Sequence, residues 1–150
     1  MLTLKKPSLI EDGKFDHVIC LNVLEHVFEF ENAFKESVRC IKKGGNIIIA
    51  TPFMHHIHGS PDDYLRYTES AYRQLAEKHN CTIESITPLG FGLFSLFYQT
   101  IGGAIPTNIA RQTCKHVSIF LDKTLNKMSK SYKKLSKKIP LGYFVVMYKN

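Results

Sequence analysis

The chain has 150 residues, of which 44% are hydrophobic, so it has the size and composition of one globular domain and not of a disordered protein. Its four cysteines form no CxxC pair and no zinc-ribbon spacing, which favours free thiols and a cytoplasmic location. The net charge of +7 is concentrated in residues 111–138, which hold nine basic residues and one acid, so an anionic partner is to be sought there.

The first part of the chain predicts a strand, a helix and a second strand. The apolar run 15–21 (FDHVICL) predicts a buried strand. Residues 31–41 place apolar side chains at helical spacing, with acids near the start and Gly44 beyond the end as a glycine cap. The run 46–53 (NIIIATPF) predicts a second buried strand, which Pro52 stops.

The rest of the chain continues this alternation and then interrupts it. Thr68 predicts the cap of a helix that runs to about His79, and a third strand follows over 81–87. A long insertion over 88–140 contains one predicted amphipathic helix with lysines outside its apolar stripe, and the run 142–149 predicts a fourth strand. The pattern is typical of an α/β sheet with crossover helices, in a single domain over 1–150.

Four segments together are similar to a known family. The segments FDHVICLNVLEHV, AFKESVRCIKKGG, NIIIATPF and PLGYFVVMYK follow one another as in the second half of class I S-adenosylmethionine-dependent methyltransferases of the type 11 group. The resemblance implies a partial Rossmann-like methyltransferase sheet. Its strands would be equivalent to the family's strands 4, 5, 7 and 6, with the last strand antiparallel and a helical insertion before it.

The family's glycine-rich cofactor loop and its acidic ribose-binding residue are expected well ahead of Phe15, and neither is found in this sequence. The resemblance therefore implies a truncated, C-terminal half of the domain. Strand 15–21 would then have an open edge, and this edge could pair with a second copy or with another polypeptide.

The resemblance also implies a set of site residues. Residues of the loop after the first strand would contact the cofactor S-adenosylmethionine: Leu21, Asn22, Val23 and Leu24. The loop after the second strand resembles the HxxPxDYxRYT form of a subgroup found with sugar and cell-surface polysaccharide biosynthesis. His58 would be the catalytic base, and the acceptor would contact His26, His55, Asp62, Tyr64 and Arg66. The alternative is that these residues only end a strand, tie a loop to itself and cap a helix.

No metal is predicted. Glu25 and His26 are similar to part of an ExxEH segment that holds a divalent metal in the quinone O-methyltransferases, but Asn22 occupies the first position here. One carboxylate, one imidazole and an amide would bind a hard cation poorly. The histidines of the later loop, His55, His56 and His58, have no HExxH or CxxC element to complete a zinc site.

Two functions remain open. One is methylation of a small-molecule acceptor, such as a hydroxyl or carboxyl on a sugar or lipid-linked intermediate, with the enzyme incomplete as this chain. The other is a non-catalytic half-domain that pairs through strand 15–21.

The lysine-rich helix predicted over 109–139 has two possible roles. It could be a solvated helix that packs on the domain or covers the acceptor. Together with the aromatic residues from 91 on, it could instead form a peripheral membrane contact over 91–139. Nucleic-acid binding is not expected, because no RNA-binding motif accompanies the lysines.

Overall fold

A computed structural model describes residues 9–59 and 62–150 of the chain, and it divides into two compact units. The sheet unit comprises Met1–Phe53, Ile57–Thr87 and Tyr143–Asn150, and the helical unit comprises Met54–His56 and Pro88–Gly142. The helical unit thus contains the segment that the sequence predicts as an insertion.

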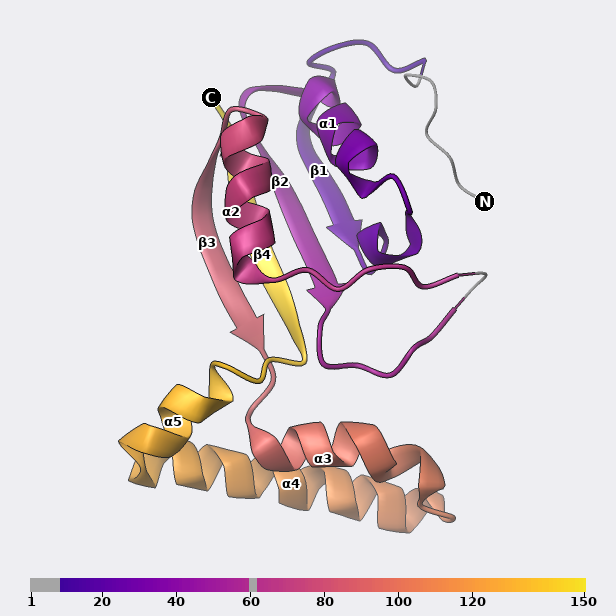
Figure 1. Ribbon diagram of the computed structural model, residues 1–150, viewed down its shortest axis with the longest axis vertical. Coiled ribbons are helices and arrows are strands. Elements are labelled where there is room, and N and C mark those ends of the chain that lie inside the picture. The colour runs from indigo at the N-terminus through magenta and orange to yellow at the C-terminus, as the bar shows by residue number, and fades with distance from the viewer. Residues whose placement is uncertain (1–8, 60–61) are drawn as a thin grey trace. The chain divides into compact units, whose positions relative to one another are not determined.

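The sheet has four strands in the order β1-β2-β4-β3: β1 (Phe15–Leu21), β2 (Ile41–Pro52), β4 (Gly142–Lys149) and β3 (Cys81–Leu89). β1 pairs with β2 in parallel. In Figure 1, β1, β2 and β3 point the same way, whereas β4 runs back toward the end at which they begin. Two helices, α1 (Phe30–Cys40) and α2 (Glu69–Lys78), lie over the same face of the sheet. The predicted α/β fold class is confirmed.

The core of the sheet unit lies between the sheet and its two helices. Its most deeply buried side chains, each at most 1% exposed, include Phe34, Ile41, Ile47, Ile49, Tyr72, Val145 and Met147. Full burial of an aliphatic or aromatic side chain of this size stabilises a fold by roughly 1.5–3 kcal/mol. As the sequence predicts, Thr68 caps α2, and its side chain accepts a hydrogen bond from the backbone N–H of Ala71.

β1 is much more exposed than the sequence predicts. Ile19 is 62% exposed and Leu21 is 51% exposed, so the prediction of a buried strand is wrong for β1. The reason is its position at the end of the strand order, where β2 is its one neighbouring strand among the described residues. Within the part of the chain that the structure describes, this edge of β1 is open and apolar, as predicted.

The connection from α1 to β2 also differs from the sequence prediction. Gly44 does not cap α1, because the helix ends at Cys40 and Ile41 is already extended and paired with Phe15. The pairing then shifts, so that His17 lies opposite Asn46. Gly44, with φ of +77°, and Gly45 lie within this irregular stretch of β2. A Cβ on Gly45 would come within 2.6 Å of the Asp16 carbonyl oxygen, so the backbones approach closely here.

The helical unit consists of α3 (Leu93–Ile101), α4 (Asn108–Met128) and α5 (Lys130–Ser136). The sequence predicts one continuous helix over its second half, and this is wrong: the chain is extended at Ser129, with φ of −130° and ψ of 115°. The Ser129 side chain accepts a hydrogen bond from the backbone N–H of Tyr132. Serine is a strong N-cap, and here it starts a new helix in a new direction.

Asp122 is the central polar group of the helical unit. It is fully buried on α4, and its carboxylate accepts hydrogen bonds from the N–H of Phe94 at 3.0 Å and from the N–H of Ser95 at 2.7 Å. The hydroxyls of Ser95 and Tyr132 donate to the same carboxylate. Burial alone would raise the pKa of Asp122, but these hydrogen bonds outweigh burial and hold that pKa below its ordinary value. Asp122 therefore joins α4 to the start of α3 and to α5.

None of the helices in the described part of the chain is long and apolar enough to cross a bilayer. All four cysteines are free, as the sequence predicts.

Substitution Asp122→Ala is expected to destabilise the protein by roughly 2–4 kcal/mol at neutral pH, because it leaves two backbone N–H groups and two hydroxyls without their acceptor. Since the folded-state pKa of Asp122 is depressed, its contribution is present above the unfolded pKa and is lost as the pH falls through the folded value. Urea unfolding, followed by circular dichroism at several pH values, measures both effects.

Lys127, which is exposed on the same helix, provides the control, and Lys127→Ala should change stability by no more than about 0.5 kcal/mol. Equal stability of Asp122→Ala and the wild type at neutral pH would contradict the role given to this carboxylate.

Candidate functional site

The candidate site lies where the loops after β1 and β2 meet. Because β1 and β2 are parallel, their carboxyl ends lie at one edge of the sheet, which is where ligands bind in open α/β folds. Three hydrogen bonds join the two loops: Tyr64 N–H to Glu25 O at 2.8 Å, Tyr67 hydroxyl to Leu24 O at 2.9 Å, and His26 Nδ1 to Asp62 O at 2.6 Å.

The loop after β1 turns sharply at Asn22. This residue has φ of +52°, in the left-handed region that asparagine tolerates better than most residues, and its N–H donates to Ala50 O at 2.8 Å. The turn leaves Leu21 and Val23 exposed, at 51% and 46%, whereas Leu24 is 2% exposed. Of the four residues predicted to contact the cofactor, Leu21 and Val23 therefore offer accessible side chains, and the Leu24 side chain belongs to the core.

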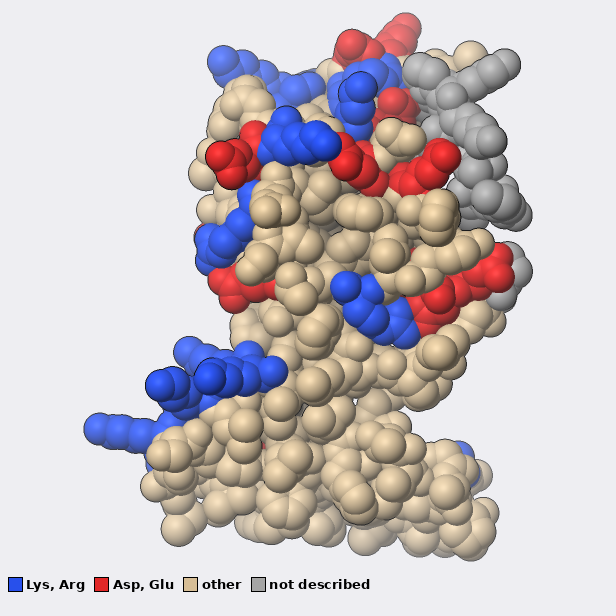
Figure 2. Space-filling model, viewed as in Figure 1, with Lys and Arg blue, Asp and Glu red and all other residues tan. Residues whose placement is uncertain are grey.

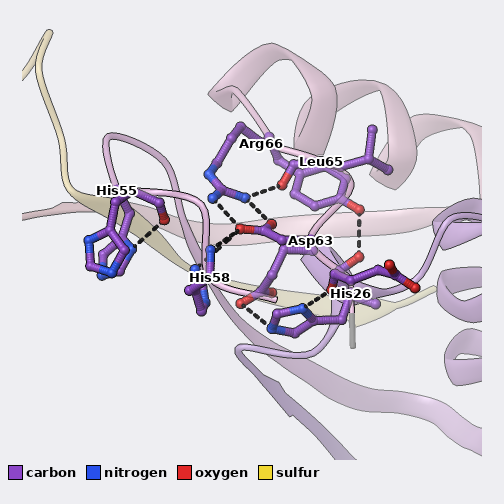
Figure 3. A network of polar contacts seen from close by, with 11 residues as sticks. His26, His55, His58, Asp63, Leu65 and Arg66 are labelled. Atoms are coloured by element: carbon purple, nitrogen blue, oxygen red, sulfur yellow. Dashed lines mark hydrogen bonds and ion pairs between the residues drawn. The ribbon is translucent and has the colours of Figure 1, made fainter. Parts of the chain in front are cut away.

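Asp63 organises the loop after β2. Its side chain is 1% exposed and forms an ion pair with Arg66, whose second terminal nitrogen lies 2.6 Å from Asp63 Oδ2. It also accepts a hydrogen bond from the backbone N–H of His58 at 3.0 Å, and His58 Nδ1 lies 3.2 Å from the same oxygen. Figure 3 shows Asp63 between Arg66 on one side and His58 and His26 on the other. The Arg66 guanidinium holds the pKa of Asp63 well below its usual range, and Asp63 raises the pKa of Arg66.

Asp63 was not predicted as a site residue from the sequence. The signal was present in the HxxPxDYxRYT form, whose aspartate falls on Asp63 and not on Asp62. Asp62, which was predicted, is exposed, and its carboxylate accepts a hydrogen bond from the Tyr64 hydroxyl at 2.8 Å. This bond raises the pKa of Tyr64.

Glu25 is a second buried carboxylate, and it was not predicted from the sequence as a site residue. It is fully buried, and neither of its carboxylate oxygens has a hydrogen-bond partner among the described residues. His26 Nε2 lies 3.8 Å from Glu25 Oε1, and the charge of Glu25 also raises the pKa of Arg66, to a smaller extent than Asp63 does. Burial raises the pKa of the neighbouring Tyr72 to about 12, and the charge of Glu25 adds to this shift.

The two histidines of the site lie next to each other. The ring centroids of His26 and His58 are 5.2 Å apart, edge to face. His55 is not grouped with them, because it belongs to the helical unit, where it lines a cavity of about 430 Å³ with Leu96, Gln99 and Thr100. The structure therefore brings His26, His58, Asp62, Tyr64 and Arg66 together near the loop after β1, and leaves His55 outside this group.

Comparison with known proteins finds one similar family model and several similar structures. Residues 4–49 match the family model described as a methyltransferase domain. A geranyl diphosphate C-methyltransferase from Streptomyces coelicolor A3(2) has a similar structure, with a TM-score of 0.56 and 12% identity over 95% of this chain and 50% of that one. A putative sarcosine dimethylglycine methyltransferase from Galdieria sulphuraria gives a TM-score of 0.54 and 14% identity over 95% and 56%. Residues 4–49 are thus similar to a methyltransferase domain family, and the chain has a fold similar to that of these methyltransferases.

The methyltransferase fold by itself does not fix the reaction. The 4+2 cyclase SpnF has a similar structure, with a TM-score of 0.53 and 12% identity over 95% of this chain and 53% of that one. Among curated proteins, none is significantly similar in sequence. The chain spans about half the length of the solved structures that it matches. Methyltransferase activity of this chain is therefore a proposal.

Substitution Asp63→Ala is expected to destabilise the sheet unit by roughly 1–3 kcal/mol at neutral pH, because it leaves the half-buried Arg66 guanidinium and the His58 N–H without their acceptor. The depressed pKa of Asp63 means that this contribution is present at neutral pH and is lost only in strong acid. Urea unfolding measures the loss of stability, and amide hydrogen exchange at His58 measures the opening of the loop.

The neighbouring acid is the matched control. Asp62→Ala removes an exposed carboxylate that bonds only to the Tyr64 hydroxyl among the contacts described here, so it should cost less than about 1 kcal/mol and leave exchange at His58 unchanged. Equal effects of the two substitutions would show that Asp63 has no special role in ordering the loop.

Proposed function

We propose that this chain supplies the acceptor side and one wall of the donor site of an S-adenosylmethionine-dependent methyltransferase that acts on a small molecule. One observation carries the proposal: the loops after two parallel strands are hydrogen-bonded together, with exposed Leu21 and Val23 on one loop and a histidine–carboxylate cluster on the other. The match to the methyltransferase domain family and the similar fold support it.

S-adenosylmethionine is proposed as the cofactor because of the similarity to methyltransferases. S-adenosylmethionine or its product is present in solved structures of the geranyl diphosphate methyltransferase. In this chain, the exposed apolar side chains of Leu21 and Val23 could pack against the adenosine portion, and the backbone of Asn22 could contact the methionine portion. The cofactor supplies the methyl group as an electrophile when it is bound.

The residues of this chain have two tasks in such a reaction. Methyl transfer needs the acceptor held in line with the donor, and a base where the acceptor must lose a proton. His58 is the candidate base, because the Asp63 carboxylate positions its ring through the contact at Nδ1. The acceptor would be a hydroxyl or carboxyl of a sugar or lipid-linked intermediate, with Tyr64 and Arg66 on the same loop as His58.

The donor site needs a further polypeptide segment beside β1. The edge of β1 is open, and an apolar groove of about 330 Å³ between β1 and α1 is lined by residues that include Phe15, Val18, Cys20 and Val23. We propose that a strand outside the described residues pairs with this edge, either from the same polypeptide or from another one. The free thiols of the four cysteines fit a reducing compartment such as the cytoplasm.

A second candidate function is a binding module that catalyses no reaction. The observation in its favour is the same open edge, because Ile19 and Leu21 form an exposed apolar strand that can add a strand from a partner.

Titration of the isotope-labelled chain with S-adenosylhomocysteine, followed by amide chemical shifts, tests the proposal. We expect weak binding, in the millimolar range, with shifts confined to residues 21–24 and 57–66. Val23→Glu, at an exposed position, should abolish these shifts without unfolding the chain, whereas Val117→Glu in the helical unit should not change them. If millimolar ligand moves none of these amides, the cofactor proposal is wrong.

The same samples separate the two candidate functions. Absence of shifts together with concentration-dependent self-association in analytical ultracentrifugation would favour the binding module. Ile19→Lys should then restore the monomer, because a lysine on an edge strand opposes strand addition.

A further inference from the structure

Three potential metal ligands converge at the site from two separate loops. Glu25 and His26 follow β1, and His58 follows β2. One ligand atom from each residue can be chosen so that all three lie within 4.8 Å of one another. The pattern of the sequence alone did not join His58 to the other two residues, since 31 intervening residues separate it from His26.

The Glu25 carboxylate needs a cationic partner. It is fully buried, and both of its oxygens lack hydrogen-bond donors among the described residues. An ionised carboxylate without donors is very unfavourable in a protein interior, where buried charges are normally paired or coordinate a metal. His26 Nε2 lies 3.8 Å from Glu25 Oε1, and this distance is too long for a normal hydrogen bond.

The hydrogen bond at the other ring nitrogen of His26 determines whether a proton or a lone pair faces Glu25. Nδ1 of His26 lies 2.6 Å from the Asp62 carbonyl oxygen, and because a carbonyl only accepts, Nδ1 carries the proton. In the neutral ring, Nε2 therefore presents a lone pair toward the Glu25 carboxylate. Two acceptors that face each other in a buried site are stabilised by a cation between them.

The contacts of both histidines are those of metal ligands. A metal-binding histidine almost always donates its second ring N–H to a backbone carbonyl or a carboxylate, which fixes the orientation of the ring. His26 has the Asp62 carbonyl at this position, and His58 has the Asp63 carboxylate 3.2 Å from Nδ1. Arg66 holds the Asp63 carboxylate in turn.

We propose that Glu25, His26 and His58 bind one divalent first-row transition metal ion, with Zn²⁺ as the ion that the donor set fits best. Two imidazoles and one carboxylate form the donor set of many catalytic zinc sites, whereas Mg²⁺ and Ca²⁺ prefer oxygen ligands. Bonds of about 2.0–2.2 Å place ligand atoms roughly 3.3 Å apart, so small side-chain rotations must close the site. This site differs from the sequence prediction of no metal. It is an alternative to the base role proposed above for His58, because a ring nitrogen bound to a metal cannot accept a proton.

Titration of the untagged full chain with Co²⁺ tests this proposal, because Co²⁺ bound by nitrogen and oxygen ligands gives d–d absorption bands in the visible range. We expect one equivalent to bind, Zn²⁺ to displace it, and Zn²⁺ to raise the melting temperature. His58→Gln should weaken binding by at least about 100-fold, because it removes a direct ligand.

The exposed His116 of the helical unit is the matched control, and His116→Gln should bind Co²⁺ like the wild type. Glu25→Gln keeps the shape of the side chain and should also weaken binding; if it fails to fold, His58→Gln alone decides. Absence of stoichiometric Co²⁺ bands from the wild type, or equal affinity in His58→Gln, would overturn the proposal.

The surface of the helical unit leads to a second, independent inference. Residues 88–142, all of which the structure describes, contain nine basic residues and one acid, Asp122. Because Asp122 is fully buried and hydrogen-bonded, this segment exposes no acidic side chain. Figure 2 shows blue Lys and Arg side chains gathered at α5. The exposed charge of the helical unit is therefore entirely positive.

The same unit exposes large apolar side chains on one face of α4. Ile109 is 83% exposed, Phe120 is 67% exposed and Met128 is 78% exposed. Together with Val117, which is 50% exposed, these residues fall within about 100° of arc around the helix axis. On α3, Phe97 is also 58% exposed. Nucleic acid would match the positive charge but not this apolar face.

We infer that α4 and α5 bind the surface of an anionic membrane. The apolar face of α4 would enter the region between headgroups and acyl chains, and the lysines of α5 would contact acidic headgroups. Flotation of the full chain with phosphatidylserine–phosphatidylcholine vesicles tests this inference. The bound fraction should exceed that with phosphatidylcholine alone by roughly ten-fold and should fall with added salt.

Two matched variants distinguish insertion of the apolar face of α4 into the bilayer from non-specific attraction to the vesicle surface. Phe120→Asp should abolish flotation, whereas Phe28→Asp, at a similarly exposed aromatic residue of the sheet unit, should not. Equal binding to both kinds of vesicle, no binding to either, or a gel shift with RNA without flotation would each overturn the membrane inference.

Discussion

The parallel pairing of β1 with β2 is the constraint on which the candidate site depends. It brings the carboxyl ends of both strands to one edge of the sheet, so that the two following loops meet although they are far apart in the sequence. The backbone carbonyls of Leu24 and Glu25 then accept hydrogen bonds from the second loop. The two loops that carry the candidate site are therefore held together by this junction.

The three buried carboxylates differ in the partners that the fold gives them. Asp122 and Asp63 are each surrounded by donors, and their pKa values are depressed. Asp122 joins three helices, and Asp63 joins His58 to Arg66 within one loop. Glu25 is as deeply buried as Asp122 but has no donor to either oxygen among the described residues. The fold therefore satisfies two buried acids with its own atoms, and the third points to a ligand.

Much of the fold could be predicted from the sequence, because its signals are local. The run 15–21, the Thr68 cap and the run 142–149 give β1, α2 and β4 with correct or nearly correct bounds. The predictions failed where a tertiary contact decides the outcome. Pairing of Ile41 with Phe15 ends α1 before Gly44, and the Ser129 cap starts a new helix within one amphipathic pattern. Asp63 and Glu25 were missed as site residues because their roles come from burial, and because the folded loop brings His58 and Arg66 to Asp63.

The open edge of β1 has a consequence for how the polypeptide reaches its folded state. Ile19 and Leu21 project from a strand whose outer N–H and C=O groups have no β-ladder partner among the described residues. Such an edge can add any extended chain that it meets, including another copy. During synthesis, the amount of protein that escapes aggregation would then depend on how long this edge stays uncovered, as well as on the stability of the finished sheet.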